Sequence, residues 1–85
     1  MAKKWLAVNV DSKGIIINVT GPYYGEFSDK MLDKMISDAK RSKASVMQVT
    51  RVYKGDKFVG KAYYDLKKNE LYPMKAPDRY GPGYY

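Results

Sequence analysis

The sequence predicts an α+β fold: one antiparallel β-sheet, with elements in the order ββαβββ, carries a single amphipathic helix across one face. Three observations predict this class. Residues 5–10 and 15–20 alternate with the period of two that half-buried strands show. Residues 29–41 repeat their apolar side chains at helical spacing. The strand-like segments that follow are joined by short turns, and short connections favour antiparallel pairing.

The first two strands are expected to form a hairpin across residues 11–14. Asp11 and Ser12 favour a type I turn, and Gly14 readily adopts the left-handed conformation that closes it. In the first strand one face holds Leu6, Val8 and Val10, and the other holds Trp5, Ala7 and Asn9.

A helix is predicted over residues 29–41, after a Gly- and Pro-containing loop at residues 21–26. Ser28 is a suitable N-cap, and Asp29 lies in the first turn, where the helix dipole favours a negative charge. The apolar stripe of this helix comprises Met31, Leu32, Met35, Ile36 and Ala39. Because such stripes pack against sheets, we expect the two methionines to fill the core.

Three further strands are predicted at residues 45–53, 58–66 and 71–74. Pro73 cannot donate to a ladder, so the last strand is expected at a sheet edge. We expect residues 1–74 to form a single domain and residues 75–85 to form a Gly-, Pro- and Tyr-rich tail. A helix about 10 Å wide shields only two or three strands spaced about 4.8 Å apart. The second face of the sheet is therefore left to solvent, to a partner or to a second copy.

The composition argues against most enzyme chemistry. The 85 residues include no cysteine and no histidine, which removes the cysteine nucleophile, the zinc-thiolate site and the usual general base. No convergent set of carboxylates, P-loop or dinucleotide fingerprint is evident. We therefore expect a non-enzymatic binding protein with no cofactor, no metal and no small-molecule substrate.

The net charge of +7 is concentrated in one stretch of the chain. Residues 1–38 carry five basic and five acidic groups, and residues 69–85 carry two of each. Residues 39–68 carry nine basic groups against two acidic ones. Such a cluster attracts anions, so phosphate backbones, acidic protein surfaces and anionic lipid heads are the candidate partners.

A nucleic-acid surface is the leading expectation for residues 43–68. If Phe58, Ala62, Tyr64 and Leu66 face the helix, then Arg51, Tyr53, Lys61 and Tyr63 form one exposed patch on the two strands. The full candidate set is Lys43, Arg51, Tyr53, Lys54, Lys57, Lys61, Tyr63, Lys67 and Lys68. Rings beside cations suit single-stranded nucleic acid. The alternatives are that tyrosine is simply a good strand residue, that lysine keeps the domain soluble, and that a bulge reverses the assignment of faces.

A protein-binding module is the second expectation, because the chain contains nine tyrosines, several of them in Gly- and Pro-containing segments that suit adaptable contacts. The candidate contact residues are Trp5, Tyr23, Tyr24, Tyr80, Tyr84 and Tyr85. Such a module would be a small phage-type inhibitor of a host or defence enzyme, or a homo-oligomer. Its contact surface would comprise the exposed sheet face, residues 21–25 and the tail. The alternatives are that Trp5 borders the core and that the tail tyrosines complete it.

The sequence shows neither a signal peptide nor a run of about 18 apolar residues. We expect a protein of the cytoplasm, or of a host cytoplasm, with no membrane partner.

Overall fold

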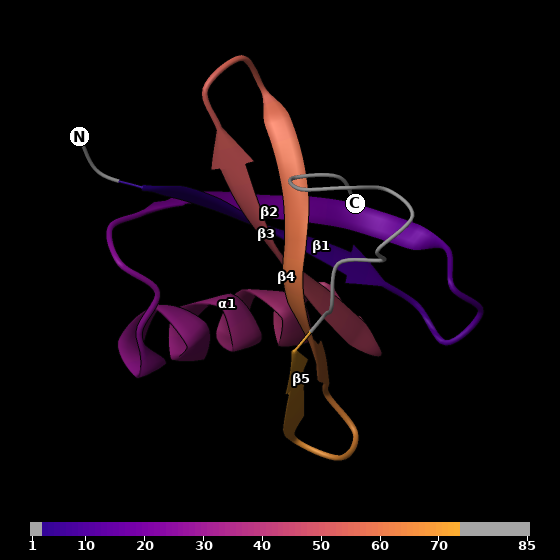
Figure 1. Ribbon diagram of the computed structural model, residues 1–85. Helices are drawn as coiled ribbons and strands as arrows, with labels where there is room; N and C mark the ends of the chain where they lie inside the picture. The colour runs from indigo at the N-terminus through magenta and orange to yellow at the C-terminus, as the bar shows by residue number, and fades with distance from the viewer. Residues whose placement is uncertain (1–2, 74–85) are drawn as a thin grey trace.

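Five strands and one helix make up residues 3–73, which are the residues that the computed structural model describes (Figure 1). The elements are β1 (Lys4–Val10), β2 (Ile16–Tyr24), α1 (Asp29–Arg41), β3 (Val46–Tyr53), β4 (Lys57–Asp65) and β5 (Glu70–Pro73). Every strand pairing is antiparallel, and the order across the sheet is β2-β1-β3-β4-β5. The predicted α+β class and ββαβββ order are confirmed, and β5 lies at an edge as Pro73 requires. The predicted tail at residues 75–85 lies outside the described residues.

The β1–β2 turn is closed by Asp11. Its carboxylate accepts hydrogen bonds from the backbone N–H groups of Lys13 and Ile15, at 2.8 and 3.0 Å. Gly14 has a φ of 84°, in the left-handed region that glycine adopts without strain. The hairpin predicted from the alternating pattern therefore forms around the expected turn residues.

The predicted loop at residues 21–26 is wrong in part, because β2 continues through Tyr24. Tyr23 pairs with Trp5, and Tyr24 pairs with Lys4. Pro22 is tolerated because β2 is an edge strand, where a missing N–H costs no ladder bond. Gly21 has a φ of 118°, and a Cβ at this residue would lie 3.1 Å from the backbone oxygen of Trp5. Glycine and proline thus shape this strand instead of ending it.

The helix begins and ends at the predicted residues. The Ser28 hydroxyl accepts a hydrogen bond from the Met31 N–H at 3.2 Å, as an N-cap should. Met35 and Ala39 are fully buried. Helix α1 lies against β1 and β2, so one face of the sheet is covered near these strands (Figure 1). We call this side of the sheet the helix face and the opposite side the open face.

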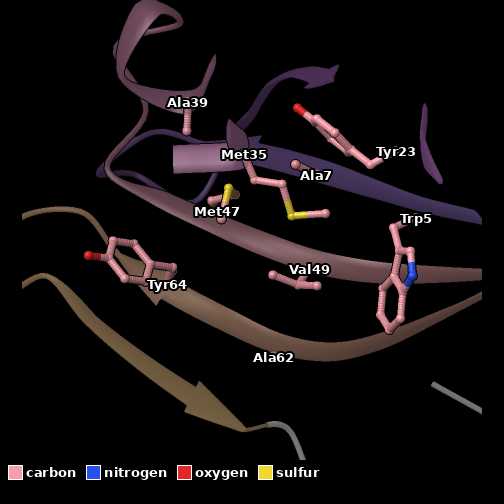
Figure 2. Close-up of a cluster of buried hydrophobic side chains, with 9 residues drawn as sticks. All are labelled: Trp5, Ala7, Tyr23, Met35, Ala39, Met47, Val49, Ala62 and Tyr64. Carbon is pink, nitrogen blue, oxygen red and sulfur yellow. The ribbon is translucent and has the colours of Figure 1, made fainter. Parts of the chain in front are cut away.

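The core lies between α1 and the helix face, and Figure 2 shows its nine buried side chains. They are Trp5, Ala7, Tyr23, Met35, Ala39, Met47, Val49, Ala62 and Tyr64. Trp5 and Ala7 lie in the core, so the face of β1 to which they belong is the helix face. Leu6, Val8 and Val10 consequently lie on the open face, where they are half-buried.

The predicted faces of β3 are wrong. Met47 and Val49 point to the helix face, so Arg51 and Tyr53, at the same parity, lie on that side too. Gln48 and Thr50 lie on the open face instead of the helix face, although Thr50 is buried there. The buried Met47 and Val49 decide this orientation, because turning them outward would expose two large apolar side chains.

A β-bulge divides β4 and changes its faces partway along. Val49 pairs with Ala62, but the next residue, Thr50, pairs with Gly60, so Lys61 is an extra residue in β4. Ala62 and Tyr64 face the helix as predicted. Phe58 does not; it pairs with Val52 on the open face and is 53% exposed.

Replacing Met35 with alanine should lower the free energy of unfolding by about 2–5 kcal/mol, because the side chain is fully buried and its loss leaves a cavity. Chemical denaturation measures this change as a shift in midpoint at constant slope. Ser37→Ala on the exposed side of α1 is the matched control and should change the midpoint little. An unchanged midpoint for Met35→Ala would mean that α1 is not docked on the sheet as described.

Candidate nucleic-acid interface

The cations predicted to form one patch gather at two opposite ends of the sheet. β3 is eight residues long, which separates its ends by roughly 23 Å. One end, at the β3–β4 turn, holds a group that we call the hairpin-end cluster: Lys4, Arg51, Lys54, Lys57 and Lys61, arranged around Tyr53. The other end holds Lys43, Lys67 and Lys68, which we call the far-end lysines. The Leu66 N–H donates to the Ser45 oxygen at 3.0 Å, which brings the segment of Lys67 and Lys68 close to that of Lys43.

Arg51 is held in place at the hairpin end. Its Nη1 donates to the backbone oxygen of Val52 and, at 3.5 Å, to that of Lys4. Its guanidinium carbon lies 4.6 Å from the ring centroid of Tyr53 and 5.6 Å from that of Trp5. Contacts of this kind between a guanidinium and aromatic rings are attractive. Arg51 therefore presents a fixed positive charge.

The bulge in β4 decides which of the predicted residues meet. Lys61 Nζ lies 5.6 Å from the ring centroid of Tyr53, so Arg51, Tyr53 and Lys61 come together as expected. Tyr63 does not join them; it lies on the open face, where its ring stacks on Tyr72 with centroids 5.0 Å apart. The Tyr53 ring already carries two cations, which leaves it a poor platform for a nucleic-acid base.

No cation of the hairpin-end cluster forms an ion pair with a carboxylate of residues 3–73, although Asp56 lies in the same turn. The ion pairs of this part of the chain join Lys3 to Glu26 and Arg41 to Asp38, each at 2.8 Å, and neither involves the cluster. A hollow of about 340 Å³ opens beside the guanidinium. Its lining residues are Lys4, Arg51, Val52, Tyr53, Lys54, Gly55 and Asp56. The cluster thus combines unpaired cations with a concave surface.

The far-end lysines have an acidic neighbour. The Asp65 carboxylate accepts hydrogen bonds from the backbone N–H groups of Lys67 and Lys68, at 2.9 and 3.1 Å. Glu70 is the cross-strand partner of Asp65. Two carboxylates beside this turn weaken the attraction that it offers to a phosphate.

Of the three described aromatic residues that were expected to contact a protein, Trp5 and Tyr23 are buried. The Trp5 Nε1–H donates to the Gly25 oxygen at 2.9 Å, and the indole packs in the core. The Tyr23 hydroxyl donates to the Asp38 carboxylate at 2.6 Å and joins β2 to α1. Tyr24 is 63% exposed and borders a hollow of about 460 Å³. Tyr80, Tyr84 and Tyr85 lie outside the described residues.

Two surface features were missed by the sequence analysis. Lys4 joins the hairpin-end cluster because β1 pairs with β3, a neighbour that the sequence order does not give. The aliphatic residues Ile15, Ile16, Ile17 and Val19 are 43–61% exposed, although their pattern resembles that of a core strand.

Residues 3–73 contain neither a metal-binding cluster of acidic side chains nor a helix that could span a membrane. Within that range there is no group of three or more acidic side chains that could hold a metal ion. Of the helices in the same range, none has the length and apolar character needed to cross a membrane.

Tyr23 should make stability depend on pH above 10. Burial and the hydrogen bond to Asp38 raise the pKa of Tyr23 from 10.0 to about 12. Because the folded state holds this proton more tightly, the stabilisation is complete below pH 10 and is lost as the pH rises toward 12. Tyr23→Phe should lower the free energy of unfolding near neutral pH by about 1.5–3 kcal/mol, since a hydrogen bond to a charged group is lost.

Urea denaturation of the two proteins between pH 7 and pH 12 provides the measurement. The loss between pH 10 and 12 should be smaller in Tyr23→Phe than in the parent protein. It should not vanish, because the hydrogen bond to Glu70 also raises the pKa of Tyr72 to about 12. Tyr24→Phe removes the hydroxyl of an exposed neighbour and should leave the parent profile unchanged. Parallel profiles for Tyr23→Phe and the parent would contradict the assignment.

Comparison with known protein families, curated proteins and solved structures finds no match to this chain. The function is therefore inferred from the fold and from the arrangement of its charged and aromatic side chains. The cations of the hairpin-end cluster are the most concentrated feature of this kind in residues 3–73.

Proposed function

We propose that the protein binds nucleic acid through phosphate contacts made by the hairpin-end cluster. The observation that carries this proposal is the convergence of five cations from β1, β3, β4 and the β3–β4 turn, none of which is ion-paired with a carboxylate of residues 3–73. Each such cation can neutralise a backbone phosphate and release a counterion, which is the main source of sequence-independent affinity. The cluster supplies this charge at one end of the sheet.

Arg51 is the central residue of the proposed site. Its backbone contacts and its place beside two rings fix its guanidinium before a ligand arrives. A fixed guanidinium matches the geometry of phosphate oxygens and loses little conformational freedom on binding. Lys4, Lys54 and Asp56 border the same hollow, so with Arg51 it is lined by three basic residues and one acidic residue.

The proposed contacts are to the phosphate backbone and carry no base recognition. The one ring within the cluster, Tyr53, is occupied by Arg51 and Lys61. The stacked pair of Tyr63 and Tyr72 lies on the open face, separate from the cations. Binding should therefore depend strongly on salt and weakly on sequence.

Two double variants test the proposed site. Lys54→Ala with Lys57→Ala removes two charges from the hairpin-end cluster, and Lys67→Ala with Lys68→Ala removes two from the far end. With three to five phosphate contacts, the log–log salt slope for a single strand should be about −2 to −3.5 in the parent protein. The first variant should flatten the slope by about 1.4, corresponding to two lost contacts. The second should leave the slope near that of the parent.

A labelled oligonucleotide titrated at several salt concentrations gives these slopes. The two variants have equal net charge, so the comparison separates a localised site from general attraction to a basic protein. Equal flattening in both variants would contradict the localised site. Affinity of the parent no tighter than millimolar near physiological salt would contradict nucleic-acid binding altogether.

A further inference from the structure

The centre of the open face is buried, although none of the elements in residues 3–73 lies over it. Thr50 is 3% exposed and Val52 is 6% exposed, and both side chains lie on the open face of β3. Gly60, the cross-strand partner of Thr50, is buried as well. Helix α1 packs on the other side of the sheet, against β1 and β2. Another part of the molecule must therefore cover these residues.

Neighbouring side chains in the sheet do not supply this cover. Gly60 has no side chain, so one side of Thr50 has no lateral neighbour. Leu6, the partner of Thr50 on β1, is only half-buried, and Phe58, the partner of Val52, is 53% exposed. A glycine inside a strand often marks a place where another backbone approaches closely. Since the structure is that of a single chain, the covering atoms belong to the same chain.

Residues 74–85 are well placed to supply the cover. They follow Pro73, which pairs with Ala62, and Ala62 pairs in turn with Val49. The segment therefore begins two strands away from the neighbour of Thr50, a distance of about 10 Å. Strands β3 and β5 run in the same direction, because both are antiparallel to β4 (Figure 1). A chain that continues from β5 thus heads along β3 toward the β3–β4 turn.

The N-terminus is too far away to reach the same place. The Lys3 oxygen accepts a hydrogen bond from the Gly25 N–H, so the chain keeps the direction of β1 at this residue. Lys3 lies three residues before Leu6, the partner of Thr50, which is about 10 Å along the strand. Residues 1–2 span at most about 7 Å, so their backbone cannot return to Thr50.

The composition of residues 74–85 suits a segment that lies across a sheet face. It contains one methionine and three tyrosines, which gain stability when they are buried against an apolar surface. Val52 supplies such a surface, with Leu6 and Phe58 beside it. The segment also contains two prolines and two glycines, which disfavour its addition to the sheet as a further strand.

We propose that residues 74–85 fold back over the open face and cover Thr50, Val52 and Gly60 with their tyrosine side chains. Arg51 and Tyr53 lie on the helix face, so this packing leaves them uncovered. The proposal is separate from nucleic-acid binding, because it uses different residues and is tested without a ligand.

Trypsin tests the packing, because the segment contains two cleavage sites, Lys75 and Arg79. A packed segment must open before it is cleaved, so the cleavage rate follows the open fraction. In the full-length protein we expect both sites to be cleaved at least about tenfold more slowly than in a free peptide of residues 70–85. Cleavage as fast as in the peptide would overturn the proposal. So would protection that appears only at high protein concentration, which would place the segment on a second copy.

Thr50→Lys disrupts the proposed docking surface, and Gln48→Lys is the matched control. Both residues lie on the open face of β3, but Thr50 is buried and Gln48 is half-buried. Gln48 also lies on the far side of Val49 from Thr50, outside the direction in which β5 ends. We expect Thr50→Lys to raise cleavage after Arg79 toward the peptide rate and Gln48→Lys to keep the parent rate.

Cleavage after Arg51, inside β3, reports global unfolding and should stay slow in both variants. If Thr50→Lys fails to fold, Gly60→Val replaces it, since this change places a side chain where the segment approaches the sheet. A folded variant of either kind that keeps the parent's protection at Arg79 would overturn the proposal.

Nuclear Overhauser contacts in the unmodified protein locate the segment directly. We expect contacts from the ring protons of Tyr80, Tyr84 or Tyr85 to the methyl groups of Thr50 and Val52. A protected segment whose rings contact α1, or no residue of the open face, would lie elsewhere on the molecule and would contradict the proposal.

Discussion

One extra residue in β4 determines how the functional surfaces of this protein are arranged. The bulge at Lys61 lets β4 keep Ala62 and Tyr64 in the core while Lys61 turns toward Tyr53. Without it, Lys61 and Tyr63 would point the same way, because strand side chains alternate with a period of two. The bulge therefore turns Lys61 toward the ring of Tyr53, which also contacts Arg51, and leaves Tyr63 on the opposite face.

The arrangement that results separates charge from apolar surface. The helix lies against β1 and β2, and the hairpin-end cluster lies at the β3–β4 turn. The exposed aliphatic residues Ile16, Ile17 and Val19 lie on β2, which contains no charged residue.

Elements governed by local chemistry were predicted well from the sequence. The helix bounds follow from Ser28 and from the stripe that contains Met35, and the first turn follows from Asp11 and Gly14. These signals act over a few residues and do not depend on the rest of the fold. The strand status of Tyr23 was missed because Gly21 and Pro22 usually interrupt strands, and only their edge position makes them compatible with one.

The candidate site was predicted less completely, because its assembly depends on register. Strand alternation predicted Arg51, Tyr53, Lys61 and Tyr63 in one group on the face away from the helix. The first three do come together, but Arg51 and Tyr53 lie on the helix face, and the assignment of Tyr63 to that group required an unbroken β4. The contribution of Lys4 required knowing that β1 lies beside β3. Neither the pairing of distant strands nor the position of a bulge is encoded in a local pattern, so these two features could be found only in the folded chain.

The most direct test of this account is the nuclear Overhauser pattern of the Lys61 side chain. The bulged register predicts contacts between the Lys61 methylene protons and the Tyr53 ring, together with ring-current shifts that Tyr53→Leu abolishes. It also predicts contacts between the rings of Tyr63 and Tyr72. Contacts from Lys61 to the Tyr63 ring, with none to Tyr53, would show a regular strand and would contradict the arrangement on which the proposed site depends.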